Sequence, residues 1–529
     1  MFPDRFLRFL VLSIVLVGPA GRLSVGHAWS AELAAELKLA AVFGDHMVLQ
    51  QRKPVPVWGW AAPGERITVS FAGQEVSAAA DDQGKWQVRL AELAASHEPR
   101  TLVVRGDKAG RERTVADVLV GEVWLGSGQS NMAMTVNRAQ QFETEQATAM
   151  HPEIRMFMEE SGAAPTVQPD GRGRWTVCSP ETVGGFSATL YFFGREIHRA
   201  LRVPVGLINS SVGGTPIESW IAADAQLAQP ELRAAIETQQ RAIAEADPAR
   251  AQAQYERALE RWKQQAAQAK AAGQTTPRRP VDPRLQQARR GGPGGLFNGK
   301  IAPLIPYAVR GVLWYQGEAN SQPGKGYLYR HQLPLLVRDW RAQWGEELPF
   351  AWVQLPNFDR SGEGWMLVRE AMLHSLQLPR TGMAITVDIG EPKDIHPRNK
   401  QDVGRRLAAW ALGKVYDRQV PSTSGPLPRG HELRGAEVVI TFDHADDGLS
   451  SNGEPVRGFV VAGADHQWHP ATARIDGGRV IVTSPAVPQP QAARYGWAAN
   501  PDANLRTGAG LPASPFRTDD WPVRDPAGS

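Results

Sequence analysis

Five short apolar runs in the middle of this sequence restrict the fold more than any other feature. They lack the polar alternation of a half-exposed strand, and stretches of helical pattern such as Tyr191–Leu201 and Gln401–Leu412 lie between them. Continuous apolar strands that alternate with helices predict a parallel sheet covered on both faces. Ligands of such sheets bind beyond the carboxyl ends of the strands. The five runs are Glu122–Leu125, Val205–Asn209, Gly311–Tyr315, Phe350–Leu355 and Met383–Asp388.

The rest of the 529-residue chain predicts further domains beside this α/β part, which we place at 119–425. Short alternating runs separated by turn residues favour a small β-sandwich at 31–118. Alternating strands return after the α/β part, so 426–529 is expected to be β-rich. Segment 226–290 is rich in Ala, Gln, Glu and Arg and predicts a helical insertion. Its apolar heptads are not sustained, which favours a solvated helix over a coiled coil.

Residues 1–30 have the pattern of a signal peptide. Arg5 and Arg8 precede the apolar run Phe9–Val17, which is shorter than the ~20 residues that span a bilayer. Small residues follow, with Ala28-Trp29-Ser30 as a cleavage site and Gly26-His27-Ala28 as a rival. We therefore expect an exported protein, periplasmic or extracellular, without membrane contact after cleavage. An uncleaved anchor or a buried helix is the alternative.

Charge and cysteine content exclude several functions. The formal net charge is +3. It falls to about +1 without residues 1–30, which hold three arginines and one aspartate. Nucleic-acid binding requires a clustered basic face, so no nucleic-acid partner is expected. Cys178 is the only cysteine, which rules out an internal disulfide and a cysteine-based zinc site. No metal is predicted, and the sequence does not indicate an oligomeric state.

The first apolar run leads into Gly126-Ser-Gly-Gln-Ser130-Asn-Met132. A serine at a strand end, flanked by glycine and entering a helix, exposes its hydroxyl, and its backbone N–H lies where negative charge is stabilised. A helix cap is the alternative role for Ser130. The G-x-S-x-G turn of α/β-hydrolases is absent, which counts against that fold.

Three more loops carry polar groups just after predicted strands. Gly213 and Gly214 let the backbone approach a ligand and direct an N–H towards it, although an ordinary turn explains them as well. Gln316 and Glu318 place an amide and a carboxylate at the same edge of the sheet. His396 stands among acidic neighbours, which suits a general base.

Taken together, these loops resemble the sialate O-acetylesterase family of the SGNH (GDSL-like) hydrolases. The resemblance implies a flavodoxin-like three-layer α/β/α core with β-rich accessory parts. It also implies removal of acetyl groups from carbohydrate hydroxyls without a metal or organic cofactor. The matching segments are GSGQSNM at 126–132, SSVGGTPIESW at 210–220, GVLWYQGEAN at 311–320 and DIHPRNKQDVGRRLAAWAL at 394–412, with lesser matches at 296–308 and 494–505.

The resemblance assigns roles to individual residues. Ser130 matches the nucleophile, and His396 matches the base that accepts its proton. The backbone N–H of Ser130, the N–H of Gly213, with Gly214 as the alternative, and the side-chain amide of Gln316 match the oxyanion hole.

The third triad member has more than one candidate. The general pattern is D-x-x-H, but Lys393 stands three residues before His396. The sialate branch has a shorter D-I-H form, which matches Asp394. Asp388, Glu391 or a backbone carbonyl are the alternative partners of the imidazole.

The predicted substrate is an acetylated carbohydrate. Trp220, Trp314 and Tyr315 are candidates for stacking on a sugar, with core packing as the more common role. An acetylxylan or other polysaccharide esterase is the alternative enzyme, and an exported carbohydrate-binding protein is the non-enzymatic one. The residues expected to contact the substrate are Gln129, Gly214, Glu318 and Arg369. Arg369 could pair with the carboxylate of a sialic acid, and a structural ion pair is its alternative role.

Overall fold

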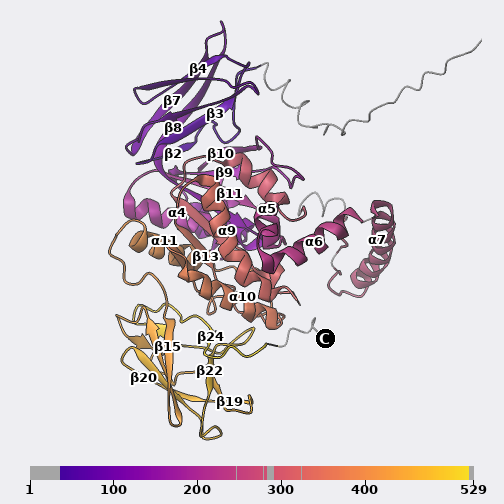
Figure 1. Cartoon of the computed structure of the whole chain (residues 1–529), viewed down its shortest axis with the longest axis vertical. Coiled ribbons are helices and arrows are strands. Elements are labelled where there is room, and N and C mark those ends of the chain that lie inside the picture. The colour runs from indigo at the N-terminus through magenta and orange to yellow at the C-terminus, as the bar shows by residue number, and fades with distance from the viewer. Residues whose placement is uncertain (1–35, 246, 278, 283–290, 323, 524–529) are drawn as a thin grey trace, which may run out of the picture.

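The computed structural model describes residues 36–245, 247–277, 279–282, 291–322 and 324–523. The predicted signal peptide lies outside the described residues. Figure 1 shows a β-rich N-terminal part, a mixed α/β part in the middle and a β-rich C-terminal part at the opposite end of the molecule. The mixed α/β fold with a large sheet and additional C-terminal sheets confirms the prediction at this level.

The N-terminal part contains two groups of strands. A three-stranded antiparallel sheet joins β1 (Lys38–Leu39), β3 (Val55–Trp60) and β6 (Lys85–Leu90). Strands β4 and β5 form an antiparallel pair, and β7 pairs with β4 and β8. The second group is β2 (Val48–Gln50), β4 (Arg66–Phe71), β5 (Gln74–Ala79), β7 (Ser96–Gly106) and the first half of β8 (Glu112–Gly128).

Strand β8 connects this part to the α/β part without a break. Its first half pairs with β7 and β2, and its second half pairs in parallel with β11 and β12. The domain boundary expected at residue 118 therefore falls inside a single strand. This continuity fixes the far end of β8, where Ser130 follows, relative to the N-terminal sheets.

The large sheet has the strand order β10-β9-β11-β8-β12-β13-β14. All neighbours are parallel except β10, which runs antiparallel to β9 at the edge. Its members, with β8, are β9 (His151–Glu159), β10 (Gly173–Cys178), β11 (Val205–Ser211), β12 (Gly311–Tyr315), β13 (Phe350–Val353) and β14 (Thr381–Ala384). Each of the five predicted runs overlaps a strand of this sheet, and the carboxyl ends of the strands meet at one edge. The runs Phe350–Leu355 and Met383–Asp388 extend beyond the ends of β13 and β14.

Alternate side chains of these strands enter two separate hydrophobic clusters. Leu125 and Trp314 belong to the cluster that contains Trp340 of α9 (Tyr329–Trp344) and residues of α10 (Glu363–His374). Trp124 and Leu313 belong to the other cluster, with residues of α4 (Ala188–Leu201) and α11 (Lys400–Lys414). Period-two alternation thus sends apolar side chains to both faces, which is why these runs show no polar positions.

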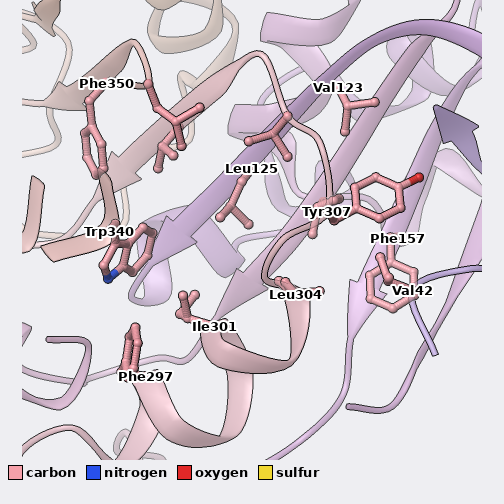
Figure 2. Packing of buried hydrophobic residues seen from close by; sticks show 14 of the residues in the cluster. Val42, Val123, Leu125, Phe157, Phe297, Ile301, Leu304, Tyr307, Trp340 and Phe350 are labelled. Atoms are coloured by element: carbon pink, nitrogen blue, oxygen red, sulfur yellow. The ribbon is translucent and has the colours of Figure 1, made fainter. Parts of the chain in front are cut away.

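Figure 2 shows the helical segment that packs against the strands in the first cluster. Phe297, Ile301 and Leu304 lie along a helical segment and point towards the strands that carry Leu125 and Phe350. All five side chains are buried. This packing holds the segment between the insertion and β12 against the sheet.

The predicted insertion is helical where it is described. It contains α6 (Pro230–Ala244) and α7 (Pro248–Ala271), and its first residues belong to α5 (Ala223–Leu227). Helix α7 stands away from the sheet, as Figure 1 shows, and nearly all of its side chains are exposed or half-buried. A solvated helix is the structure that its sequence predicts.

The C-terminal part has its own hydrophobic cluster, formed by residues of two four-stranded sheets. One sheet has the order β15-β16-β21-β20 and the other β19-β18-β22-β24, with a short pair β17-β23 beside them. The strands are β15 (Leu427–Arg434), β16 (Glu437–Asp443), β17 (Leu449–Ser450), β18 (Phe459–Ala462), β19 (Trp468–Pro470), β20 (Thr472–Asp476), β21 (Arg479–Thr483), β22 (Ala492–Tyr495), β23 (Arg506–Thr507) and β24 (Phe516–Arg517).

Candidate active site

Ser130 is the first residue of the short helix α2 (Ser130–Ala133), two residues after β8 ends. The turn depends on Gly128, whose φ is +134° and where an added Cβ would lie 2.2 Å from the carbonyl oxygen of Tyr315. Only glycine tolerates this conformation and this approach. The chain therefore turns sharply at the strand end and leaves Ser130 half-buried at the edge of the sheet.

His396 reaches Ser130 from a loop that lies between β14 and α11. Its Nε2 lies 2.8 Å from the Ser130 Oγ, although the two residues are 266 positions apart in the sequence. Burial lowers the pKa of His396, so the neutral imidazole, which can accept a proton, is favoured at neutral pH. The predicted nucleophile and base are thus brought together at hydrogen-bond distance.

Asp394 is the carboxylate that faces the imidazole. Its Oδ1 lies 3.6 Å from the Nδ1 of His396, and 58 % of its side chain is exposed. The same Oδ1 accepts a hydrogen bond of 2.9 Å from the His396 backbone N–H. Because 3.6 Å exceeds hydrogen-bond length, the carboxylate acts on the ring as a nearby charge. This geometry differs from that of a serine protease triad, in which a buried carboxylate accepts the imidazole N–H.

The two alternative carboxylates are held by other groups. Asp388 forms a two-pronged ion pair with Arg406 and a further ion pair with Arg506. Glu391 accepts a hydrogen bond from the backbone N–H of Arg398. Asp394 is therefore the one candidate of the three whose carboxylate contacts the His396 ring within the described residues.

Gly213 and Gly214 form a turn directly after β11. A Cβ added to Gly213 would lie 3.5 Å from the Cβ of Ser130, so the two backbones are close. The N–H of Gly213 donates to no acceptor in the described part of the chain. Gly214 has φ +71°, a left-handed conformation that favours glycine and closes the turn. This geometry fits an N–H of Gly213 that is free to meet a ligand at Ser130.

Gln316 does not fit the predicted role of oxyanion donor. Its side chain is fully buried, and Nε2 donates to the Thr215 carbonyl at 3.1 Å and to Asn320 Oδ1 at 2.7 Å. Its Oε1 accepts from the Tyr329 hydroxyl at 3.0 Å. A primary amide has two N–H donors, and both are used within the protein. Gln316 instead ties the Gly213 turn, through Thr215, to the loop after β12.

Arg369 is the second prediction that the structure corrects. Its side chain is 1 % exposed, and its guanidinium donates to the backbone carbonyls of Leu355, Pro356, Ala498 and Ala499. Burial lowers its pKa to about 9, so it remains a cation at neutral pH. A carboxylate of a substrate has no route to it. Arg369 joins the C-terminal part to the loop after β13.

The remaining predicted substrate residues lie beside the Ser130 loop. Gln129 is buried, and its Oε1 accepts from the Ala319 backbone N–H, whereas its Nε2 has no partner in the described part of the chain. Glu318 is also buried, and its Oε1 accepts from the side-chain nitrogen of Asn131 at 2.5 Å. Burial raises the pKa of Glu318. Contact of either residue with substrate remains a prediction.

The three aromatic candidates for sugar stacking belong to the core. Trp220, Trp314 and Tyr315 are each fully buried. The rings of Trp220 and Trp314 pack edge to face with centroids 6.0 Å apart. None of the three presents a face to a ligand.

Two residues near the catalytic pair were not singled out from the sequence. Asn131 and Lys400 are fully buried, and the Lys400 ammonium donates to Asn131 Oδ1 at 2.8 Å. Each stands inside a segment that carries the family resemblance, one position after Ser130 and four after His396. Position within those segments was the available signal, but it does not reveal that the two side chains meet.

The described residues contain no group of three or more His, Cys, Asp or Glu side chains arranged to hold a metal ion. Within the same ranges, no helix combines the length and the apolar character needed to cross a membrane.

A serine hydroxyl held against a histidine ring at the strand ends of a parallel α/β sheet is an arrangement that hydrolases with a serine nucleophile also have. A family model described as carbohydrate esterase, sialic acid-specific acetylesterase, matches residues 120–273 and 299–412. The chain belongs to this family of carbohydrate esterases. Its activity is therefore that of an esterase that removes acetyl groups from carbohydrates.

Individual relatives support the same assignment. The chain is 26% identical to a sialate O-acetylesterase of Mus musculus over 90% of this chain and 94% of the relative. It is 28% identical to the Homo sapiens sialate O-acetylesterase, over 77% of this chain and 76% of the relative. A crystal structure of a carbohydrate acetylesterase from Xanthomonas citri superposes with a TM-score of 0.77 at 38% identity, covering 92% of this chain and 100% of the other.

Proposed function

We propose that this protein is a sialate O-acetylesterase that works through an acetyl-enzyme on Ser130. The observation that carries the proposal is the 2.8 Å contact between the Ser130 hydroxyl and His396 Nε2. The pair lies at the carboxyl edge of the parallel sheet, where ligands of such sheets bind. The relatives named above support the choice of substrate class.

The first half of the reaction forms the acetyl-enzyme. Ser130 Oγ attacks the acetyl carbonyl carbon while His396 accepts the hydroxyl proton. The carbonyl oxygen gains the negative charge and is placed between the N–H groups of Ser130 and Gly213. When the tetrahedral intermediate collapses, the bond to the sugar oxygen breaks, and His396 returns its proton to that oxygen. The sugar leaves as an alcohol.

The second half repeats these steps with water. His396 takes a proton from a water molecule, whose oxygen attacks the acetyl carbon. Collapse breaks the bond to Ser130 Oγ, which recovers the proton from His396, and acetate is released. Each oxyanion donor of this kind contributes roughly 3–4 kcal/mol of transition-state stabilisation.

The carboxylate of a sialic acid needs a cation other than Arg369. Arg360 is exposed and has no ion pair in the described part of the chain. It lines a cavity of about 200 Å³ together with Glu318 and Ile395, the residue before His396. We therefore assign Arg360 to the carboxylate of the substrate, in place of Arg369.

The proposal extends to fold family and location. The helices packed on both faces of the parallel sheet support a three-layer SGNH hydrolase core. The predicted signal peptide supports export to the periplasm or the medium.

The test is acetate release from a panel of acetylated sialic acids, acetylated xylan and small acetyl esters. We expect acetylated sialic acids to be preferred, and Ser130→Ala and His396→Ala each to abolish release while remaining folded. Preference for acetylated xylan would replace the proposed substrate, and full activity of Ser130→Ala would refute the mechanism.

A second comparison tests Arg360. Arg360→Gln is expected to raise KM for acetylated sialic acid about tenfold, because a hydrogen bond to a charged group is lost. KM for a neutral acetyl ester should change much less. Arg418→Gln, an exposed arginine just beyond α11, is the control. Equal changes of KM for both substrates would refute the assignment of Arg360 to the substrate carboxylate.

A further inference from the structure

His396 is held by its backbone on both sides. The carbonyl oxygen of Ile395, just before it, accepts a hydrogen bond of 3.0 Å from Asn131 Nδ2. The carbonyl oxygen of Pro397, just after it, accepts one of 2.6 Å from Lys400 Nζ. The two donors are themselves joined by the 2.8 Å bond from Lys400 Nζ to Asn131 Oδ1.

The same group is tied to the nucleophile. Asn131 follows Ser130 directly in α2, and Lys400 is the first residue of α11. A single pair of side chains therefore connects the helix that carries the serine to the loop that carries the histidine. The path from Ser130 to His396 through Asn131 contains no exposed group, since Asn131 and Lys400 are both 0 % exposed.

We propose that Asn131 and Lys400 are positioning residues that act as a buried brace and keep the His396 imidazole against the Ser130 hydroxyl. This inference rests on the proposed role of His396 as the base. Neither residue touches the reacting atoms. Their action is to fix the backbone of residues 395–397 relative to α2.

The surroundings of Lys400 explain how a lysine is accommodated there. Its ammonium lies 5.4 Å from the centre of the Tyr315 ring, and Glu318 accepts from Asn131 on the other side. Burial lowers the pKa of Lys400 to about 7, against the opposing charges of Glu318, Glu391 and Asp394. A neutral amine still donates hydrogen bonds, so the brace is present in both protonation states.

Removing Lys400 has an electrostatic consequence that a purely structural residue would not have. Burial is the main cause that lowers the pKa of His396, Asp394 opposes it, and the charges of Arg138 and Lys400 lower it further. Loss of the lysine charge therefore raises the pKa of His396. The acid limb of kcat/KM, which follows the neutral imidazole, should move to higher pH.

The experiment compares Lys400→Met, Asn131→Ala and the double variant with the full-length protein. Methionine keeps the length of the lysine chain, and Lys414→Met, an exposed lysine at the other end of α11, is the matched control. Folding is followed by thermal unfolding. kcat is measured on a small acetyl ester and expressed per active site titrated with a fluorophosphonate.

We expect each single variant to lower kcat about 10- to 100-fold, the range for displaced catalytic groups, with KM changed less than about twofold. Because the two residues act as one unit, the double variant should lose little more than either single variant. Full kcat per titrated site and an unmoved acid limb in folded Lys400→Met would overturn the proposal. If that variant does not fold, Asn131→Ala decides, and full kcat per titrated site in folded Asn131→Ala overturns the proposal.

The His396 pKa is also measured directly, with labelled histidine rings by NMR, and its signal assigned from His396→Ala. This readout does not need turnover, so it separates the brace from the proposed function. A rise of the His396 pKa in Lys400→Met supports the placement of the Lys400 charge beside the ring even where no acetyl ester is hydrolysed, and no change in that pKa refutes this placement. The positioning itself is decided by kcat per titrated site. Inactivity of the wild-type protein on every acetyl ester would instead refute the proposed function.

Discussion

Replacing Asp394 by asparagine tests whether the protein has a true triad. A buried aspartate that accepts the imidazole N–H is worth about four orders of magnitude in kcat in serine proteases. Here the Asp394 Oδ1 lies 3.6 Å from His396 Nδ1, and 58 % of the side chain is exposed. The carboxylate is therefore beyond hydrogen-bond length and in contact with solvent. We expect Asp394→Asn to have a far smaller effect than in those enzymes.

The size of the effect follows from the distance. Two unit charges at this separation interact by about 1 kcal/mol in water. Salt reduces this further. Since 1.4 kcal/mol corresponds to tenfold in rate, the imidazolium formed during attack loses stabilisation worth roughly fivefold in kcat, and at most about tenfold.

The pH dependence has a defined sign. Burial lowers the pKa of His396, and the Asp394 charge raises it. Removing that charge lowers the pKa further, so the neutral imidazole persists to lower pH. The acid limb of kcat/KM should move to lower pH in Asp394→Asn, opposite to the shift expected for Lys400→Met.

The assay is kcat and kcat/KM on a chromogenic acetyl ester across the acid range, at low and at high salt. Glu391→Gln is the control, because Glu391 lies on the same loop and does not contact the ring. A loss of about a thousandfold or more would mean that the carboxylate hydrogen-bonds the ring during catalysis. An unmoved acid limb together with unchanged kcat would mean that His396 is oriented without Asp394.

Three further predictions concern two buried side chains and the absence of a metal requirement. Gln316→Ala should lower the free energy of unfolding by about 2–4 kcal/mol, because three buried hydrogen bonds are lost; chemical denaturation measures this, and unchanged stability with a large loss of kcat would restore the role of oxyanion donor. Arg369→Met should cost about 3 kcal/mol or more of stability, since four backbone carbonyls lose their donor, two of them on the buried residues Leu355 and Pro356, while KM for acidic and neutral esters changes equally; a selective rise for the acidic ester would contradict this. Chelators should leave the rate unchanged, and inhibition reversed by a divalent ion would show a metal requirement.

The central strands were predictable from the sequence, but the edge of the sheet was not. The run Gly311–Tyr315 coincides with β12, and Val205–Asn209 lies within β11. Strand β9 was not recognised because its segment contains charged residues. Two of these, Arg155 and Glu159, are buried and neutralised by Asp117 and Lys300 from distant parts of the chain. A local pattern cannot show such partners.

The positions of Ser130 and His396 were also predictable, since both follow strands of one parallel sheet. The turn that brings Gly213 to Ser130 follows from the same reasoning. Their exact separation was not predictable, because it depends on Asn131 and Lys400, whose contact joins segments that are 269 positions apart.

Gln316 and Arg369 show a more general reason why motif positions do not equal substrate contacts. Gln316 was expected to meet the substrate because it matches the oxyanion position of the family, and Arg369 because a guanidinium can pair with a sialic acid carboxylate. Both side chains use their donors on buried protein acceptors. A buried polar group must be satisfied, so a side chain whose donors are all used has none left for a ligand. Donors with unused capacity in the described part of the site include the N–H groups of Ser130 and Gly213 and the Nε2 of Gln129. These three are therefore the donors to examine first when a substrate is placed against Ser130.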